Sequence, residues 1–130
     1  MSERPLIEAE REKILSLPAE AQYAPNGIVS RTLLRTENLR TVLFGFAEGQ
    51  ELTEHTSTQH ALVQILSGEC EFCLRGQAHQ MRAGDFLSVP PNVPHSVKAT
   101  QQFSMLLILS KPSPPSEKAL RRQPSVAVQA

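Results

Sequence analysis

Six short runs of apolar or alternating residues, separated by turns that contain glycine, most constrain what this chain can fold into. Short runs spaced roughly 8 to 12 residues apart are typical of antiparallel sandwiches and small barrels. The runs occupy Ile28 to Leu34, Thr41 to Ala47, Ala61 to Leu66, Cys70 to Leu74, Phe86 to Val89 and Phe103 to Leu109. None of them keeps a helical period. The pattern therefore predicts an all-β fold rather than a parallel sheet, which needs crossover helices.

Glycine and proline usage divides the 130-residue chain into three parts. All six glycines and every predicted strand fall within residues 27–109, which we expect to form one domain. Residues 1–26 form an N-terminal extension with a partial apolar stripe, which predicts one short amphipathic helix between Pro5 and Pro18. Residues 110–130 are rich in Pro and Ser and hold four basic residues against one acidic residue. We expect this tail to be disordered and to act as a solubilising extension. The alternative is that the basic tail binds an acidic partner.

The overall charge and the lack of long apolar runs argue against two classes of partner. Thirteen Lys and Arg residues balance thirteen Asp and Glu residues, so the broad positive field of nucleic-acid-binding proteins is missing. No apolar run approaches the roughly 20 residues of a membrane-spanning helix. The N-terminus, with three glutamates among its first ten residues, does not read as a signal peptide. We expect a cytoplasmic protein that binds neither nucleic acid nor membranes.

Two segments carry the most specific pattern in the sequence. The first runs from Gly49 through His55 to Gly68, and the second runs Gly84-Asp-Phe-Leu-Ser-Val-Pro-Pro-Asn-Val-Pro-His95. They resemble the two motifs of the cupin superfamily, the first a glycine, five residues and a histidine, the second a glycine, five residues, a proline and later a histidine. The resemblance covers about residues 27–109. It implies the double-stranded β-helix of RmlC-like cupins, a jelly-roll barrel that holds a ligand and often a metal.

The resemblance also implies a metal site of three histidines and one glutamate. His55 and His95 match two of these positions, whereas Ser57 and Ala61 stand where the second histidine and the glutamate belong. His60 offers a replacement, so the predicted metal ligands are His55, His60 and His95, holding a divalent Zn, Ni, Fe, Mn or Cu. Strand alternation opposes this, because His60 and Ala61 face opposite sides unless a bulge precedes them.

A barrel without metal is the alternative, in which His55 and His95 line a polar pocket that binds a ligand or moves a proton. His79 fits a place at the pocket edge or surface better than a ligand role. We expect the rest of the cavity to be apolar, with walls drawn from Phe44, Phe46, Val63, Phe72, Met105 and Leu107.

The two cysteines have a C-x-x-C spacing, but they do not predict a redox or zinc site. Residues three apart on a strand face opposite sides, so the sulfurs of Cys70 and Cys73 cannot readily meet or share an ion. We expect two reduced and mostly buried thiols, as is usual in the cytosol.

Two functions from different classes fit these observations. One is a metal-dependent cupin that binds a small organic molecule in the barrel and acts on it as an oxygenase, an isomerase or a lyase. The other is a metal-free ligand-binding or sensor module. No catalytic residue is assigned, and the substrate and the presence of enzyme activity stay open. We also expect a homodimer, formed through the strand Cys70 to Leu74 or the run Ile28 to Leu34.

Overall fold

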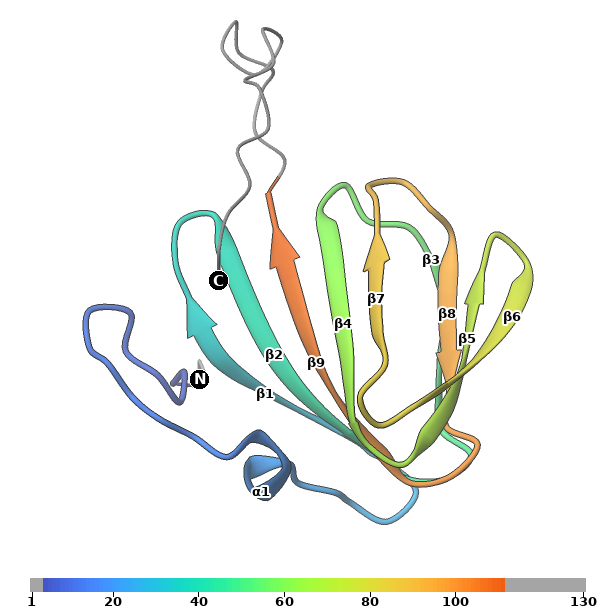
Figure 1. Ribbon diagram of the computed structural model, residues 1–130, viewed down its shortest axis with the longest axis horizontal. Helices are drawn as coiled ribbons and strands as arrows, with labels where there is room; N and C mark the ends of the chain where they lie inside the picture. The colour runs from blue at the N-terminus through green and yellow to red at the C-terminus, as the bar shows by residue number, and fades with distance from the viewer. Residues whose placement is uncertain (1–3, 112–130) are drawn as a thin grey trace, which may run out of the picture.

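The computed structural model describes residues 4–111, and within them nine strands form two antiparallel sheets that face each other (Figure 1). The first sheet has five strands in the order β1 (Ile28–Arg35), β2 (Leu39–Phe46), β9 (Phe103–Ser110), β4 (His60–Ser67) and β7 (Phe86–Val89). The second has four, in the order β3 (Glu51–His55), β8 (His95–Lys98), β5 (Glu69–Leu74) and β6 (Gln77–Arg82). The chain crosses repeatedly between the sheets, which confirms the predicted jelly-roll barrel.

All six predicted runs are strands, but three further strands were not predicted. β6 reads Gln-Ala-His-Gln-Met-Arg and buries only Met81. β3 and β8 are short and largely polar, and Val97 on β8 is the single buried residue of the two strands. β6 and β8 both pair with the more apolar β5, and β3 pairs with β8. Backbone pairing in the barrel, rather than their own composition, therefore makes them strands.

The helix expected between Pro5 and Pro18 is wrong in position. The one helix of the described chain, α1 (Leu17–Glu20), is a single turn with Pro18 in its first turn, where proline is tolerated. Upstream, the backbone amides of Leu6 and Ile7 donate to the carbonyl groups of Thr32 (3.0 Å) and Leu33 (2.7 Å) on β1. An isolated short helix is marginal in water. Hydrogen bonding to the exposed edge of β1 is therefore more favourable for this segment than forming an isolated helix.

The stretch after α1 lies across the outer face of the five-stranded sheet at Gly45. A side chain at Gly45 would collide with the carbonyl oxygen of Gln22, so only glycine permits this approach. Beside it, the hydroxyl of Tyr23 lies 3.2 Å from Ser67 Oγ, which in turn lies 2.7 Å from Ser104 Oγ. The N-terminal extension is thus fastened to the barrel wall.

The core lies between the two sheets. Phe46 and Phe103 are fully buried and stack with ring centroids 4.6 Å apart. Cys70 is buried in the same core, while Cys73 is half-buried. Both cysteines are free, as predicted. The expected disorder of residues 110–130 falls, beyond Lys111, outside the described residues.

No helix among residues 4–111 has the length and apolar character needed to cross a membrane.

Candidate functional site

The pairing of β3 with β8 brings the two motif histidines into contact. His55 ends β3, His95 begins β8, and the two residues are direct partners in the antiparallel register. Their imidazole centroids are 4.3 Å apart, with the ring planes inclined at 58°. Two distant segments of the chain therefore place two imidazoles at one end of the barrel, as the motifs predict.

Backbone hydrogen bonds fix the orientation of both rings. Nδ1 of His55 lies 2.9 Å from the carbonyl oxygen of Thr53, and Nδ1 of His95 lies 2.8 Å from that of Val93. A carbonyl oxygen only accepts, so each Nδ1 carries the proton and donates it. In the neutral ring, Nε2 then has a free lone pair. The His pair, defined as His55 and His95, thus offers two Nε2 acceptors.

A narrow cavity of about 40 Å³ lies beside the His pair. It is lined by Leu52, His55, Ala61, Val63, Phe72, Val89, His95, Val97, Met105 and Leu107. A water molecule needs at least about 10–15 Å³ of such space, and pockets for drug-sized ligands have about 300–1,000 Å³. The cavity has room for a few waters or an ion, and a larger ligand must sit at its mouth, where His55 is exposed and His95 half-buried.

The predicted apolar walls are correct in four positions and wrong in two. Val63, Phe72, Met105 and Leu107 line the cavity, whereas Phe44 and Phe46 do not. Phe46 belongs instead to the fully buried core, and Phe44 packs against that core with its ring centroid 5.9 Å from that of Phe46.

Ala61 points into the cavity, at the position where the cupin pattern has a glutamate. It is 3% exposed and lines the cavity with the His pair. A methyl group therefore stands where a carboxylate would face a metal. The wall opposite the imidazoles is apolar.

The structure does not bring His60 to the His pair. β4 keeps a regular register from His60 to Ile65, so His60 faces away from Ala61, toward the outside of the barrel. Its Nε2 lies 2.7 Å from Ser88 Oγ on β7. The bulge that would have turned His60 inward is absent from this part of β4; the register shift of the strand comes later, between Ile65 and Ser67. Within residues 4–111, no group of three or more His, Cys, Asp or Glu side chains is placed to hold a metal ion.

His79 lies at the opening between β6 and β7, away from the cavity of the His pair. It lines a separate open space of about 310 Å³ with Leu74, Met81, Asp85, Phe86 and Leu87. This position agrees with the expectation of a pocket-edge histidine.

The residues that sequence reasoning missed are Thr53 and Val93, whose roles rest on backbone carbonyl groups. Side-chain identity carries no signal for such a role.

Comparison with known proteins places this geometry in a family. Residues 42–110 match the cupin domain family, and the chain belongs to that family. It is 32% identical to a conserved protein of unknown function from Streptococcus pyogenes, with a TM-score of 0.75 over 88% of this chain and 98% of that one.

Two further crystal structures agree. A cupin superfamily protein from Desulfitobacterium hafniense is 26% identical, with a TM-score of 0.73 over 78% of this chain and 94% of that one. An RmlC-like cupin from Desulfovibrio desulfuricans is also 26% identical, with a TM-score of 0.70 over 77% and 97% of the two chains. No curated protein matches the sequence.

Proposed function

We propose that this cupin binds a small organic molecule at the mouth of the barrel, directly through the imidazoles of the His pair and without a resident metal ion. The observation that carries the proposal is the pair of Nε2 acceptors, held by the two Nδ1–H donations to backbone carbonyl groups. They stand beside an otherwise apolar cavity. A few fixed polar groups in an apolar wall are the usual composition of a small-molecule site.

The donor set favours direct binding over a metal centre. Transition-metal sites in proteins draw on three or four protein ligands. Of the four cupin positions only His55 and His95 carry ligand side chains, since Ser57 and Ala61 occupy the others and His60 faces outward. Two imidazoles are an incomplete set for a tightly held ion.

The two Nε2 acceptors define the chemistry of the ligand. Each Nε2 accepts a hydrogen bond, so the matching group is a hydroxyl or an N–H donor. Either ring can also take up a proton from that group. No Asp or Glu of the described chain lines the cavity, so the His pair is the source of acid–base chemistry at this mouth. We assign no reaction step.

A second candidate is a metal ion held by the same pair. An Nδ1–H donation to a carbonyl group is the arrangement that orients imidazole ligands of metals, and both rings have it. A Zn, Ni, Fe, Mn or Cu ion would leave positions open for water or substrate and would polarise a bound oxygen.

Elemental analysis of protein produced in metal-supplemented medium separates the two candidates. Direct binding predicts less than about one-tenth of an ion per chain, unchanged in His95→Ala. Near-stoichiometric metal that is lost in His95→Ala but kept in His60→Ala would overturn it in favour of the metal centre. For ligand binding, small hydroxylated molecules are screened by thermal shift. Hits should disappear in His55→Ala and His95→Ala but persist in His60→Ala, the control histidine outside the cavity.

We further propose a homodimer in the cytoplasm, formed through the outer face of the five-stranded sheet. The two surfaces expected from sequence are less suitable, because β5 lies inside its sheet and residues 6–7 pair with the edge of β1. The outer face instead carries partly exposed apolar residues on paired strands, Leu62, Leu106 and Ile108. Light scattering should give twice the 14.4 kDa chain mass, and Leu62→Lys should reduce it. A wild-type mass of 14.4 kDa would contradict the dimer, and cell fractionation tests the location.

A further inference from the structure

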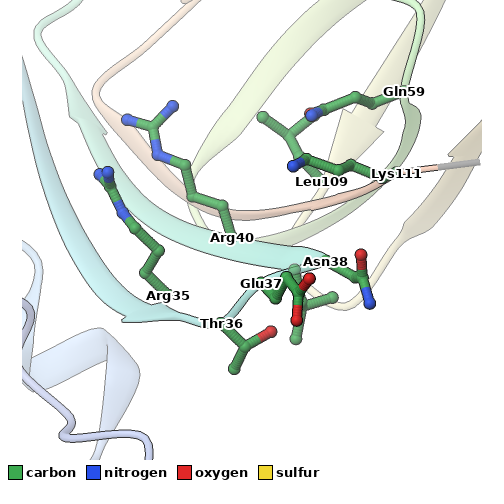
Figure 2. Close-up of a pocket in the computed structure, with 9 residues that line it drawn as sticks. Arg35, Thr36, Glu37, Asn38, Arg40, Gln59, Leu109 and Lys111 are labelled. Atoms are coloured by element: carbon green, nitrogen blue, oxygen red, sulfur yellow. The ribbon is translucent and has the colours of Figure 1, made fainter.

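Three cations gather at one corner of the barrel mouth. Arg35 at the end of β1 and Arg40 on β2 are direct cross-strand partners. Lys111 follows β9, and its backbone amide donates to the carbonyl oxygen of Asn38 at 3.0 Å. Figure 2 shows both guanidinium groups on the same side of the β1–β2 hairpin, with the Lys111 amine extending toward them. We call these three residues and the space between them the basic corner.

Within residues 4–111, none of the three cations is in an ion pair. Among residues 4–111 the ion pairs are Arg11 with Glu8 and Arg31 with Glu20, on other parts of the molecule. Like charges directly opposite each other on paired strands are destabilising. The fold therefore holds Arg35 against Arg40 without an ion pair to any carboxylate of the described chain.

The basic corner encloses a space of about 210 Å³. Among the described residues Glu37 is the only carboxylate that lines it, so three positive charges less one negative give this lining a net charge of +2. Leu39 and Leu109 add apolar surface. The space is larger than a few waters need and smaller than a drug-sized pocket. A compact dianion, alone or on a small organic body, matches its charge and size.

One row of the sheet joins the basic corner to the cavity of the His pair. Across the strands the direct partners run Arg40, Leu109, Ala61 and Val89. Ala61 and Val89 line the cavity, whereas Leu109 and Arg40 line the basic corner. Since neighbouring strands are about 4.8 Å apart, Arg40 lies about 10 Å along the sheet from Ala61. The two sites lie at the same end of the barrel but are lined by different residues.

We propose that the basic corner binds a phosphate group, as free phosphate or as the phosphate of a small phosphorylated molecule. Guanidinium groups recognise phosphate through paired N–H donors, and each charge-assisted hydrogen bond is stronger than a neutral one. A phosphate dianion would relieve the repulsion between Arg35 and Arg40. The inference is independent of the His pair, because the Nε2 atoms of that pair accept hydrogen bonds, whereas the cations of the basic corner donate them.

The test is calorimetric titration of the full chain with inorganic phosphate, at constant ionic strength set with sodium chloride. We expect saturable binding of one phosphate per chain, about tenfold or more weaker in Arg40→Gln and in Arg35→Gln. Arg82→Gln, an exposed arginine on β6 of the other sheet, should bind as the wild type does. The proposal would be overturned if Arg40→Gln bound phosphate as tightly as the wild type does. It would also be overturned if titration of the wild type with phosphate gave no more heat than titration with sodium chloride.

Two further arms complete the experiment. Without phosphate, Arg40→Gln should melt at or above the wild-type temperature, because a repulsion is removed; a lower melting temperature would contradict the unpaired arrangement. Titration with phenyl phosphate identifies the source of the group: affinity above that of inorganic phosphate indicates a phosphorylated molecule, and equal affinity indicates free phosphate. His55→Ala should keep phosphate binding even if the proposed function of the His pair fails.

Discussion

His55 and His95 face each other across β3 and β8 with ring centroids 4.3 Å apart, and each donates its Nδ1–H to the carbonyl group two residues before it. Both rings are therefore oriented before any ligand arrives. Preorganised polar groups lower the entropic cost of binding. The hydrogen bonds are local, within two residues, so the pair contributes little to holding the barrel together.

Replacing His55 should thus separate binding from stability. We expect His55→Ala to change the free energy of unfolding by about 0.5 kcal/mol or less, because its side chain is exposed. The same substitution should abolish binding of any ligand found for the wild type. Urea unfolding measures the first effect and titration the second. A loss of stability comparable to that of a core substitution such as Val63→Ala would show that the ring is structural.

Gly68 and Gly76 form a matched pair for testing how closely the chain packs at the β4–β5 turn. Both have positive φ, +76° and +82°, so alanine costs about 1 kcal/mol at either from backbone strain alone. At Gly76 an added Cβ meets nothing within 4 Å, whereas at Gly68 it collides with the carbonyl oxygen of Gln102 and lies 2.8 Å from Cα of Phe103. We expect Gly68→Ala to cost about 3 kcal/mol or more and Gly76→Ala about 1 kcal/mol.

Chemical denaturation of the two alanine variants checks this difference. Equal losses would mean that the backbone near Phe103 yields easily, and that the turn at Gly68 requires only the left-handed conformation.

The strands that could be predicted are those that bury side chains on their own account. β2, β4 and β9 supply half of the buried residues of the main core cluster, and their apolar character is visible in the sequence. β3 and β6 expose almost every side chain, so nothing in their composition distinguishes them from loops. Their pairing partners, which make them strands, are fixed only by the closed barrel.

Within the candidate site, the motif histidines were predictable and their surroundings were not. The spacing of two motifs places His55 and His95 together, and strand alternation already opposed His60. The Nδ1 acceptors at Thr53 and Val93 are backbone atoms, and the basic corner depends on the register of Arg35 against Arg40. Register is a property of the assembled sheet, so no local pattern reveals it.

Stability should fall at alkaline pH because of Cys70. Burial, with a smaller contribution from the charge of Asp85, raises the pKa of its thiol from 9.0 to about 12. Below pH 9 the folded and unfolded chains both hold this proton, and the stabilisation is complete. As the pH rises from 9 to 12 only the folded chain keeps it, so stability falls by up to about 1.4 kcal/mol per pH unit.

Urea unfolding at about pH 8 and about pH 10.5 measures this slope. Cys70→Ala should show a smaller loss between the two pH values than the wild type, whatever its absolute stability. Cys73→Ala, the half-buried control, should keep the wild-type slope. Identical slopes in all three proteins would assign the alkaline loss to other groups.

Ala61→Glu combined with Ser57→His should create a metal site from the existing His pair. Ala61 is 3% exposed and lines the cavity with both imidazoles, so the new carboxylate enters a space of about 40 Å³ walled by apolar groups. Without a cation, an unpaired buried carboxylate costs several kcal/mol. With a divalent ion, the carboxylate and the added imidazole complete the cupin ligand set, and binding to the folded state alone raises its stability.

The measurement is the melting temperature with Ni²⁺ or Zn²⁺ and then with excess chelator. In chelator, the double variant should melt well below the wild type. Metal should restore most of the lost melting temperature, because binding stabilises the folded state by about 3 kcal/mol at an ion concentration of 100 times Kd. Wild type and the single variant Ser57→His should respond much less, because the apolar wall at Ala61 supplies no charge to balance the ion. A wild-type response as large as that of the double variant would mean that His55 and His95 already suffice for a metal centre, and the direct-binding proposal would give way to the metal-bound one.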